Sequence, residues 1–437
     1  MIETLSILAL VMVLAAFLAW PEISLYALTA CLPVIGWDFY WHGFILPLAD
    51  LVALLALTAF FARFIYQRFF KVAKPLKLKW PLFLPFAIFL LISVISSLLA
   101  KNPLYSLWYV ARWPLFLYFA YIFLPYNLVT SGRLFRKTLM ALALSSTIVL
   151  ISGYLSLYGQ DWQDSFFRIR SIAWFGVFPF GENHNLIAEF LNVGALIFLA
   201  LREFYEDSRV RRWCDIAFAL TSMGIVLTFS RAGWITLALQ IIIYIIYKTD
   251  QKKRLNTIFA LFGIVLIMSP LLWKMDQLQK DNVSSTENRV LLTEISLAAF
   301  HERPFLGFGS GEFINLVGDN IRFTAKYGEP IDSHGMLQKV LAENGIFGLA
   351  AWLFILAYLL RIGYLTIRHY YRDNPWILPL GLAAAGGLFF QFFNTSYYKG
   401  KVWLPVTLFL LAARLLETKY QKRQKQMNAY EDAAEKN

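Results

Sequence analysis

The sequence predicts an all-α integral membrane protein with about twelve transmembrane helices and a long helical loop between the ninth and tenth spans. Of its 437 residues, 59% are hydrophobic and only 16% are charged, whereas a soluble chain carries about 25% charged residues. Apolar runs close to the roughly 20 residues that a helix needs to cross a bilayer recur along the whole chain. These observations predict the fold class.

Twelve apolar segments define the expected spans. The first segment is too long for one straight span, and Pro21 divides it because proline interrupts a helix. Counted once, the divided segment gives twelve crossings. The segments are 4–36, 44–66, 81–100, 105–127, 138–157, 184–202, 214–229, 234–248, 256–273, 346–361, 376–394 and 402–416.

The basic residues predict the orientation. The formal net charge is +12, and Lys and Arg cluster after the second, fourth, sixth, eighth, tenth and last apolar segments. Basic loops lie on the cytoplasmic side of membranes, so both termini and these loops are expected there, in contact with membrane lipids. This distribution argues against a nucleic-acid partner. If 1–36 crossed twice, only the N-terminus would move outside.

The predicted organisation is therefore spans one to nine in 1–273, an outer loop in 274–345, spans ten to twelve in 346–416 and a basic cytoplasmic tail in 417–437. The outer loop has the composition of a globular domain, and long connections of this kind are often functional. Cys31 and Cys214 lie in apolar stretches and indicate neither a disulfide framework nor a zinc site.

The outer loop opens with a helix-start signal. Ser284 and Glu287 have the spacing of a capping box, which places Arg289 in the first turn. The helix dipole favours negative charge there, so a cation indicates an anion bound nearby. In the alternative interpretation, Arg289 is an exposed charge paired with Glu287 or Asp281.

The segment "GFGSGEF" contains three glycines spaced two apart. No strand precedes it and no Gly-Lys-Ser/Thr follows, so its pattern is not that of a phosphate-binding loop. A tight turn after Pro304 is the better interpretation.

The segment "IDSHGMLQKVLAENGIFGL" (331–349) predicts a helix capped by Asp332 or Ser333 that ends near Glu343. His334 then lies in its first turn, where the dipole and nearby arginines lower the pKa of the imidazole. A neutral imidazole can accept a proton at physiological pH. The alternative is a capping or surface histidine.

The segment "VLTFSRAGWITLAL" places Arg231 between two short apolar segments, on the outer side. An arginine at the membrane rim is costly and indicates a functional site, although snorkelling to lipid headgroups is an alternative. Arg231, Arg289 and His334 together suit a diphosphate-bearing substrate and a hydroxyl to be deprotonated. The sequence has neither an HExxH motif nor a Cys/His metal spacing, so we expect neither a metal nor a cofactor.

Three motifs in order resemble those of the bacterial O-antigen ligase/O-antigen polymerase superfamily, which are polytopic membrane glycosyltransferases. They are "SRAGW" (230–234), "ENRVLLTEISLAAFHERPFLGFGSGEF" (287–313) and "DSHGMLQKVLAENGIFGL" (332–349). The resemblance covers 184–361 by motif and the remainder by topology. Family members often have His-Asn where this chain has His334–Gly335. Secondary candidate site residues within these motifs and the related "GENHNLIAEFL" are Asn183, His184, Asn185, Arg303 and Glu343.

The resemblance implies glycan transfer at the periplasmic face of the bacterial inner membrane, from undecaprenyl diphosphate to a sugar hydroxyl. The acceptor is lipid A–core in a ligase and another lipid-linked repeat unit in a polymerase. His334 would act as general base with inversion at the anomeric carbon, and Arg231 and Arg289 would hold the diphosphate without a metal. The ligase is the leading hypothesis. The alternatives are a polymerase, a lipid-linked glycan transporter and a structural membrane protein.

Overall fold

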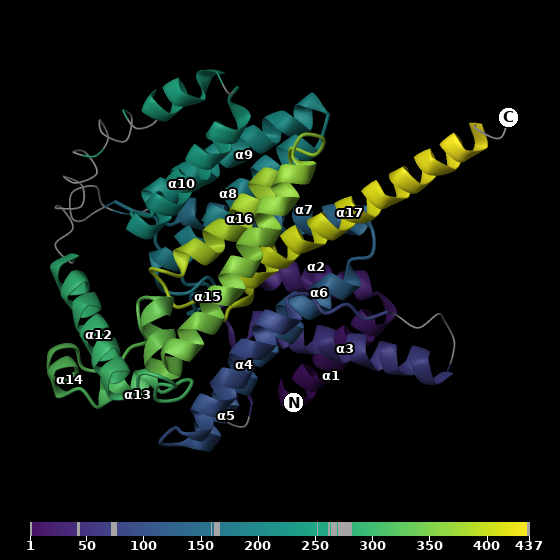
Figure 1. Cartoon of the computed structure of the whole chain (residues 1–437). Helices are drawn as coiled ribbons and strands as arrows, with labels where there is room; N and C mark the ends of the chain where they lie inside the picture. Colours follow the sequence, from purple (N-terminus) through teal and green to yellow (C-terminus); the bar gives the residue numbers. More distant parts are fainter. Residues whose placement is uncertain are drawn as a thin grey trace.

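Helices make up nearly all of the regular structure in the computed structural model of the chain (Figure 1). The structure describes residues 2–41, 44–70, 77–158, 160, 167–250, 252–260, 263, 269 and 282–434. Within this part, strands β1 (Asp38–Trp41) and β2 (Phe44–Pro47) form an antiparallel hairpin in which Asp38 pairs with Pro47. The predicted all-α class is confirmed apart from this hairpin.

The first apolar segment is broken where the sequence predicts. Helix α1 (Ile2–Ala19) ends before Trp20, and α2 (Pro21–Cys31) begins with the proline at its first position. Proline is tolerated there because the first N–H groups of a helix have no intrahelical partner. Helices α3 (Leu48–Phe70) and α4 (Phe83–Leu98) follow.

The next span contains two widened turns. Helix α5 (Pro103–Val110) continues through the π-helical segments η1 (Ala111–Leu115) and η2 (Tyr118–Phe123) into α6 (Leu124–Leu128). Pro114 lies inside η1, where it cannot donate a helical hydrogen bond and its ring crowds the preceding turn. The π segments relieve this conflict, and such bulges often occur at functional sites.

Helix α8 (His184–Phe204) is the central helix of the bundle. It packs against α7 (Gly132–Leu155), α9 (Ser208–Leu227), α10 (Arg231–Lys248) and α16 (Ile377–Phe390). Of its apolar window, 83% is buried inside the protein. A helix that is apolar all round is expected in such a position.

Residues 282–327 form three helices with a small hydrophobic core of their own. These are α12 (Asn282–Glu302), α13 (Phe313–Gly318) and α14 (Ile321–Tyr327). Apolar side chains of all three helices meet Ala342 of α15 (Met336–Tyr370) in this core. Figure 1 shows the three helices beside the first part of α15, at the end of the bundle opposite the one from which α17 (Gly400–Ala434) projects.

Within the residues that the structure describes, six helices are long and apolar enough to cross a membrane. They are Leu48–Phe70, Pro103–Leu128, Gly132–Leu155, His184–Phe204, Arg231–Lys248 and Met336–Tyr370. Shorter apolar helices occur at Ile7–Ala19, Phe83–Leu98 and Ile377–Phe390. The chain is thus a multi-pass membrane protein, while the count of twelve spans stays a prediction. Of the expected span 256–273, residues 256–260, 263 and 269 are helical and the rest lies outside the described residues.

Candidate functional site

The glycine-rich segment after α12 closes over a break in α15. At Gly345 the backbone of α15 is non-helical, with φ of +63°. The N–H groups of Phe308 and Gly309 donate to the carbonyls of Ala342 and Glu343 just before this break, at 3.0 and 2.9 Å. Because these N–H groups hold α15, the interpretation as a turn rather than a phosphate loop is confirmed. The glycines with positive φ in this segment are Gly307, Gly309 and Gly311.

His334 lies immediately before α15, not within it. The helix begins at Met336, and Gly335 is its N-cap residue, with an extended backbone (φ −159°). The Ser333 hydroxyl donates to the carbonyl of Gly335 at 2.8 Å. The predicted capping by Asp332 or Ser333, with His334 in the first turn, is therefore wrong. The extended glycine shifts the start of the helix by two residues.

The imidazole of His334 is held in its neutral form by its surroundings. Burial lowers the pKa of His334, and the positive charge of Arg289 lowers it further, while the carboxylate of Asp332 opposes both. The lowered pKa agrees with the prediction, but burial rather than the helix dipole is the main cause. An imidazole with this pKa is unprotonated at neutral pH and can accept a proton.

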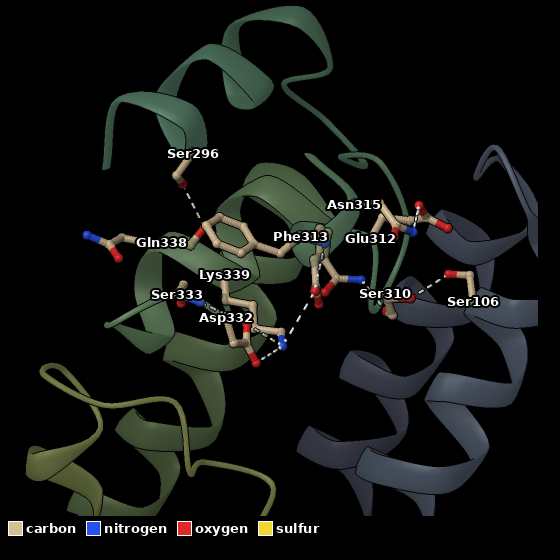
Figure 2. Close-up of polar contacts among 12 residues, drawn as sticks. Ser106, Ser296, Ser310, Glu312, Phe313, Asn315, Asp332, Ser333, Gln338 and Lys339 are labelled. Atoms are coloured by element: carbon tan, nitrogen blue, oxygen red, sulfur yellow. Dashed lines mark hydrogen bonds and ion pairs between the residues drawn. The ribbon is translucent and has the colours of Figure 1, made fainter. Parts of the chain in front are cut away.

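Lys339 restrains the carboxylate next to His334 (Figure 2). Its ammonium group contacts both carboxylate oxygens of Asp332, at 2.8 and 2.6 Å, and lies 3.8 Å from Glu343. The side chain of Lys339 is only 6% exposed and lies over the ring of Tyr109. Sequence reasoning missed this pair. The only available signal was that Asp332 precedes His334 and Lys339 follows it. We call residues 332–335 the histidine turn.

Arg289 lies in the second turn of α12, not in the first. The helix begins at Asn282, two residues before the predicted start at Ser284; the side chain of Ser284 lies outside the described part of the structure, so the capping box stays a prediction. Glu287, offered as a partner for Arg289, instead forms an exposed ion pair with Lys326 at 2.6 Å.

The guanidinium of Arg289 is partly buried and incompletely bonded. Its Nε atom is buried without a hydrogen-bond partner among the described residues. Burial lowers the pKa of Arg289, and the positive charge of Arg231 contributes in the same direction. Two neighbouring guanidinium groups that repel each other favour a bound anion, which would offset the repulsion.

Arg231 is the first residue of α10. The side chain of Ser230 caps the helix by accepting the N–H of Gly233 at 3.2 Å. Phe229, just before the cap, has a φ of +54°, which is uncommon for a residue with a side chain. The chain thus reverses between α9 and α10 in a tight link, and the exposed Arg231 emerges from this link.

Electrostatic interactions join the three candidates, since Arg231 acts on Arg289 and Arg289 acts on His334. Contacts between α12 and α15 support this arrangement. The Ser296 hydroxyl donates to the carbonyl of Gln338 at 2.7 Å (Figure 2). The structure therefore places an unprotonated base near Arg289, which in turn lies near Arg231. The catalytic and binding roles of the three residues stay predictions.

The connection between α16 and α17 contacts the start of α15, next to the histidine turn. Gln391 accepts the N–H of Met336 at 3.0 Å through its backbone carbonyl, and its side chain donates to the buried carboxylate of Glu189 at 2.7 Å. Asn394 donates to the same carboxylate at 3.0 Å, and Lys401 forms an ion pair with it at 2.6 Å. This network fixes the first residue of α15.

The motif residues Asn183, His184 and Asn185 lie at the start of α8. Asn183 caps the helix by accepting the N–H of Asn185 at 2.8 Å. His184 is the first helical residue and interacts electrostatically with Arg168. Helix capping thus accounts for Asn183, while a role of His184 and Asn185 in the site stays a prediction.

The remaining secondary candidates make structural contacts. Arg303 donates to the carbonyl of Leu99 at 3.2 Å and lies over the ring of Phe308. Glu343 is fully buried, and its carboxylate accepts the N–H of Phe313 at 3.3 Å. Both residues therefore join the glycine-rich segment to neighbouring helices.

These features define a class, namely a multi-pass helical membrane protein with a histidine and an arginine beside the helical unit α12–α14 and a second arginine nearby. Within the described residues, no group of three or more His, Cys, Asp or Glu could hold a metal ion.

The model of the O-antigen ligase family matches residues 216–353, a segment that contains Arg231, Arg289 and His334. This match confirms the resemblance to the O-antigen ligase superfamily and indicates a membrane enzyme of the ligase/polymerase kind. No curated protein matches the sequence.

Proposed function

We propose that the chain is an O-antigen ligase of the bacterial inner membrane, acting in lipopolysaccharide biosynthesis. It transfers a glycan from undecaprenyl diphosphate to a sugar hydroxyl of lipid A–core on the periplasmic face. The observation that carries the proposal is the linked set of a neutral His334, a partly buried Arg289 and Arg231 inside the segment that matches the family.

In the proposed reaction, His334 accepts the proton of the acceptor hydroxyl. The acceptor oxygen attacks the anomeric carbon from the side opposite the diphosphate, and the bond from that carbon to the diphosphate oxygen breaks. The configuration is therefore inverted, and the diphosphate leaves with the bonding electrons. Arg231 and Arg289 bind the diphosphate and stabilise the charge that develops on it, each by about 3 kcal/mol. This mechanism requires no metal ion.

A direct test uses purified enzyme with a lipid-diphosphate-linked glycan and a lipid A–core acceptor. His334→Ala should lower kcat by roughly 10²- to 10⁴-fold, because general base catalysis contributes that much, while donor binding is retained. Arg289→Gln should instead weaken donor binding. Activity that disappears in EDTA and returns with magnesium would contradict the metal-independent mechanism.

The ligase and polymerase hypotheses differ in the acceptor. In a deletion strain, core lipid without O-chains supports a ligase, whereas core lipid that bears single repeat units supports a polymerase. A lipid-linked glycan transporter predicts no product at all with purified enzyme and both substrates.

A further inference from the structure

A second group of cations lies around the ring of Trp113. The guanidinium carbon of Arg112 is 4.3 Å from the ring centroid of Trp113, and the ammonium of Lys399 is 4.0 Å from the same centroid. Arg112 forms an ion pair with Asp50 at 2.8 Å. The other oxygen of Asp50 accepts the hydroxyl of Tyr121 at 2.7 Å. We refer to Arg112, Trp113 and Lys399 as the tryptophan cluster.

Within the described part of the chain, Lys399 is the cation of the tryptophan cluster that has no carboxylate in contact. Asp50 is fully engaged by Arg112 and Tyr121, and the neighbouring Lys401 is paired with Glu189. Among the described residues, no carboxylate oxygen lies within 4 Å of the Lys399 ammonium. The Nη1 atom of Arg112 is buried without a hydrogen-bond partner in this part of the chain. Such buried, unsatisfied donors are uncommon and call for an explanation.

The surroundings of Lys399 disfavour the charged form of its ammonium group. Its pKa is lowered to about 8, chiefly by burial; Arg112 and Lys401 contribute in the same direction, and Asp50 and Asp38 oppose them. An anion bound at the ammonium would favour its protonated form and offset the repulsion. Two cations of the tryptophan cluster thus gain from the same kind of ligand.

A chain of aromatic contacts connects this cluster to the histidine turn. The ring of Tyr109 lies 6.2 Å from that of Trp113 and 6.3 Å from that of Tyr398. Lys339, which holds Asp332, lies over Tyr109 at 5.2 Å. Helix α12 with Arg289 packs on one side of the first part of α15, and α4 and α5 lie on the other (Figures 1 and 2). The tryptophan cluster is therefore connected to the histidine turn through Tyr109 of α5, whereas Arg289 approaches it from α12.

A glycan transferase must bind two substrates, a donor and an acceptor, and the chain has two separate groups of cations. We propose that the tryptophan cluster binds an anionic group, phosphate or carboxylate, on the acceptor glycan, and that Lys399 and Arg112 are its ligands. This inference rests on the proposed function, in which Arg231 and Arg289 bind the diphosphate of the donor. It extends that function by defining the acceptor as an anionic glycan.

Lys399→Gln in the full-length enzyme tests the proposal, because the KM values for acceptor and donor should respond differently. The KM for acceptor should rise by roughly tenfold, as expected for the loss of one charge-assisted contact, with the donor KM and kcat unchanged. Lys399→Arg should restore the acceptor KM. Lys101→Gln, at an exposed lysine between α4 and α5, is the matched control and should leave both KM values unchanged.

Modified acceptors identify the anionic group. Phosphatase treatment of the acceptor should abolish the difference between wild type and Lys399→Gln if the group is phosphate, and reduction of the sugar carboxyls should do so if it is carboxylate. A rise in the donor KM instead would assign the tryptophan cluster to the donor and overturn the proposal. An unchanged acceptor KM would also overturn it.

Binding of the untreated acceptor without donor separates this proposal from the proposed function. If the purified protein transfers no glycan yet binds the acceptor more tightly than Lys399→Gln does, the proposed function fails and the anion site stands. If the variant does not fold, the affinities of the wild type for treated and untreated acceptor still test whether the anion site exists. Equal affinity for all acceptor forms would contradict an anion site.

Discussion

At the scale of single residues, the protonation state of His334 depends on two charges of opposite sign. Arg289 favours the neutral imidazole, and Asp332 favours the charged one. Lys339 contacts both oxygens of Asp332 and so compensates the charge of this carboxylate. Burial and Arg289 therefore dominate the pKa of His334 and keep it low, so the imidazole stays available as a base.

The pH dependence of kcat/KM should report this balance. His334 is active when unprotonated, so kcat/KM should fall as pH drops through its pKa, which lies below the ordinary value of about 6.5. Arg289→Gln removes a positive charge, raises the pKa of His334 and should move this acid limb to higher pH. Asp332→Asn should move it to lower pH. The pH profile of each purified variant provides the measurement.

Arg289→Lys is the control, because it keeps the charge and should leave the acid limb in place even if donor binding weakens. The position of the limb is the informative quantity, since Arg289 variants also change the height of the profile. An acid limb at the same pH in Arg289→Gln and wild type would show that Arg289 does not act on the base.

At the scale of elements, the break in α15 depends on the glycine-rich segment. Ser310 belongs to this segment, and its backbone carbonyl accepts the hydroxyl of Ser106 on α5 at 2.7 Å (Figure 2). Its own hydroxyl accepts the side-chain amide of Asn344 at 2.9 Å. The segment thereby joins α5 to α15 just before Gly345.

Gly307→Ala should be strongly destabilising for this reason. A Cβ atom at Gly307 would lie 2.5 Å from the backbone carbonyl carbon of Glu343, and the position has a φ of +66°. We expect a loss of roughly 3 kcal/mol or more, from backbone strain and overpacking together. Gly328→Ala is the matched control, because its φ is +80° with no atom within 4 Å, so that backbone strain alone acts there and costs about 1 to 3 kcal/mol.

Thermal denaturation of both variants in detergent measures the difference. The melting temperature of Gly307→Ala should fall well below that of Gly328→Ala. Similar values would show that the contact between the glycine-rich segment and α15 contributes little to stability.

The sequence predicted the elements of this region better than their ends. The break near Gly345 and the turn after Pro304 follow from glycine and proline chemistry, which is local. The starts of α12 and α15 were misplaced because polar residues that can cap a helix were assumed to do so. Ser333 instead bonds to the carbonyl of Gly335. The choice between these partners depends on the tertiary neighbours, such as Gln391 beside Met336.

At the scale of the whole molecule, the candidate site combines residues that are distant in the sequence. Hydropathy and basic clusters predict the apolar helices and their orientation, because both signals lie within short windows. The contacts of Lys399 with Trp113 and of Lys401 with Glu189 join segments more than two hundred residues apart. No periodicity in either segment indicates its partner, which is why sequence reasoning did not find the tryptophan cluster as a site.

The orientation of the chain determines which compartment supplies the substrates, and labelling of single cysteines tests it. In a variant without Cys31 and Cys214, Lys101→Cys and Asp319→Cys should react with a membrane-impermeant maleimide in intact spheroplasts. Both positions are exposed and adjoin α5 and α13, and Figure 1 shows these helices near the first part of α15. Arg372→Cys and Lys425→Cys are also at exposed positions, but they follow basic clusters and should react only after permeabilisation. If Arg372→Cys reacts in intact spheroplasts and Asp319→Cys does not, the chain is inverted. His334 and both arginines would then face the cytoplasm, and periplasmic transfer to lipid A–core would be excluded.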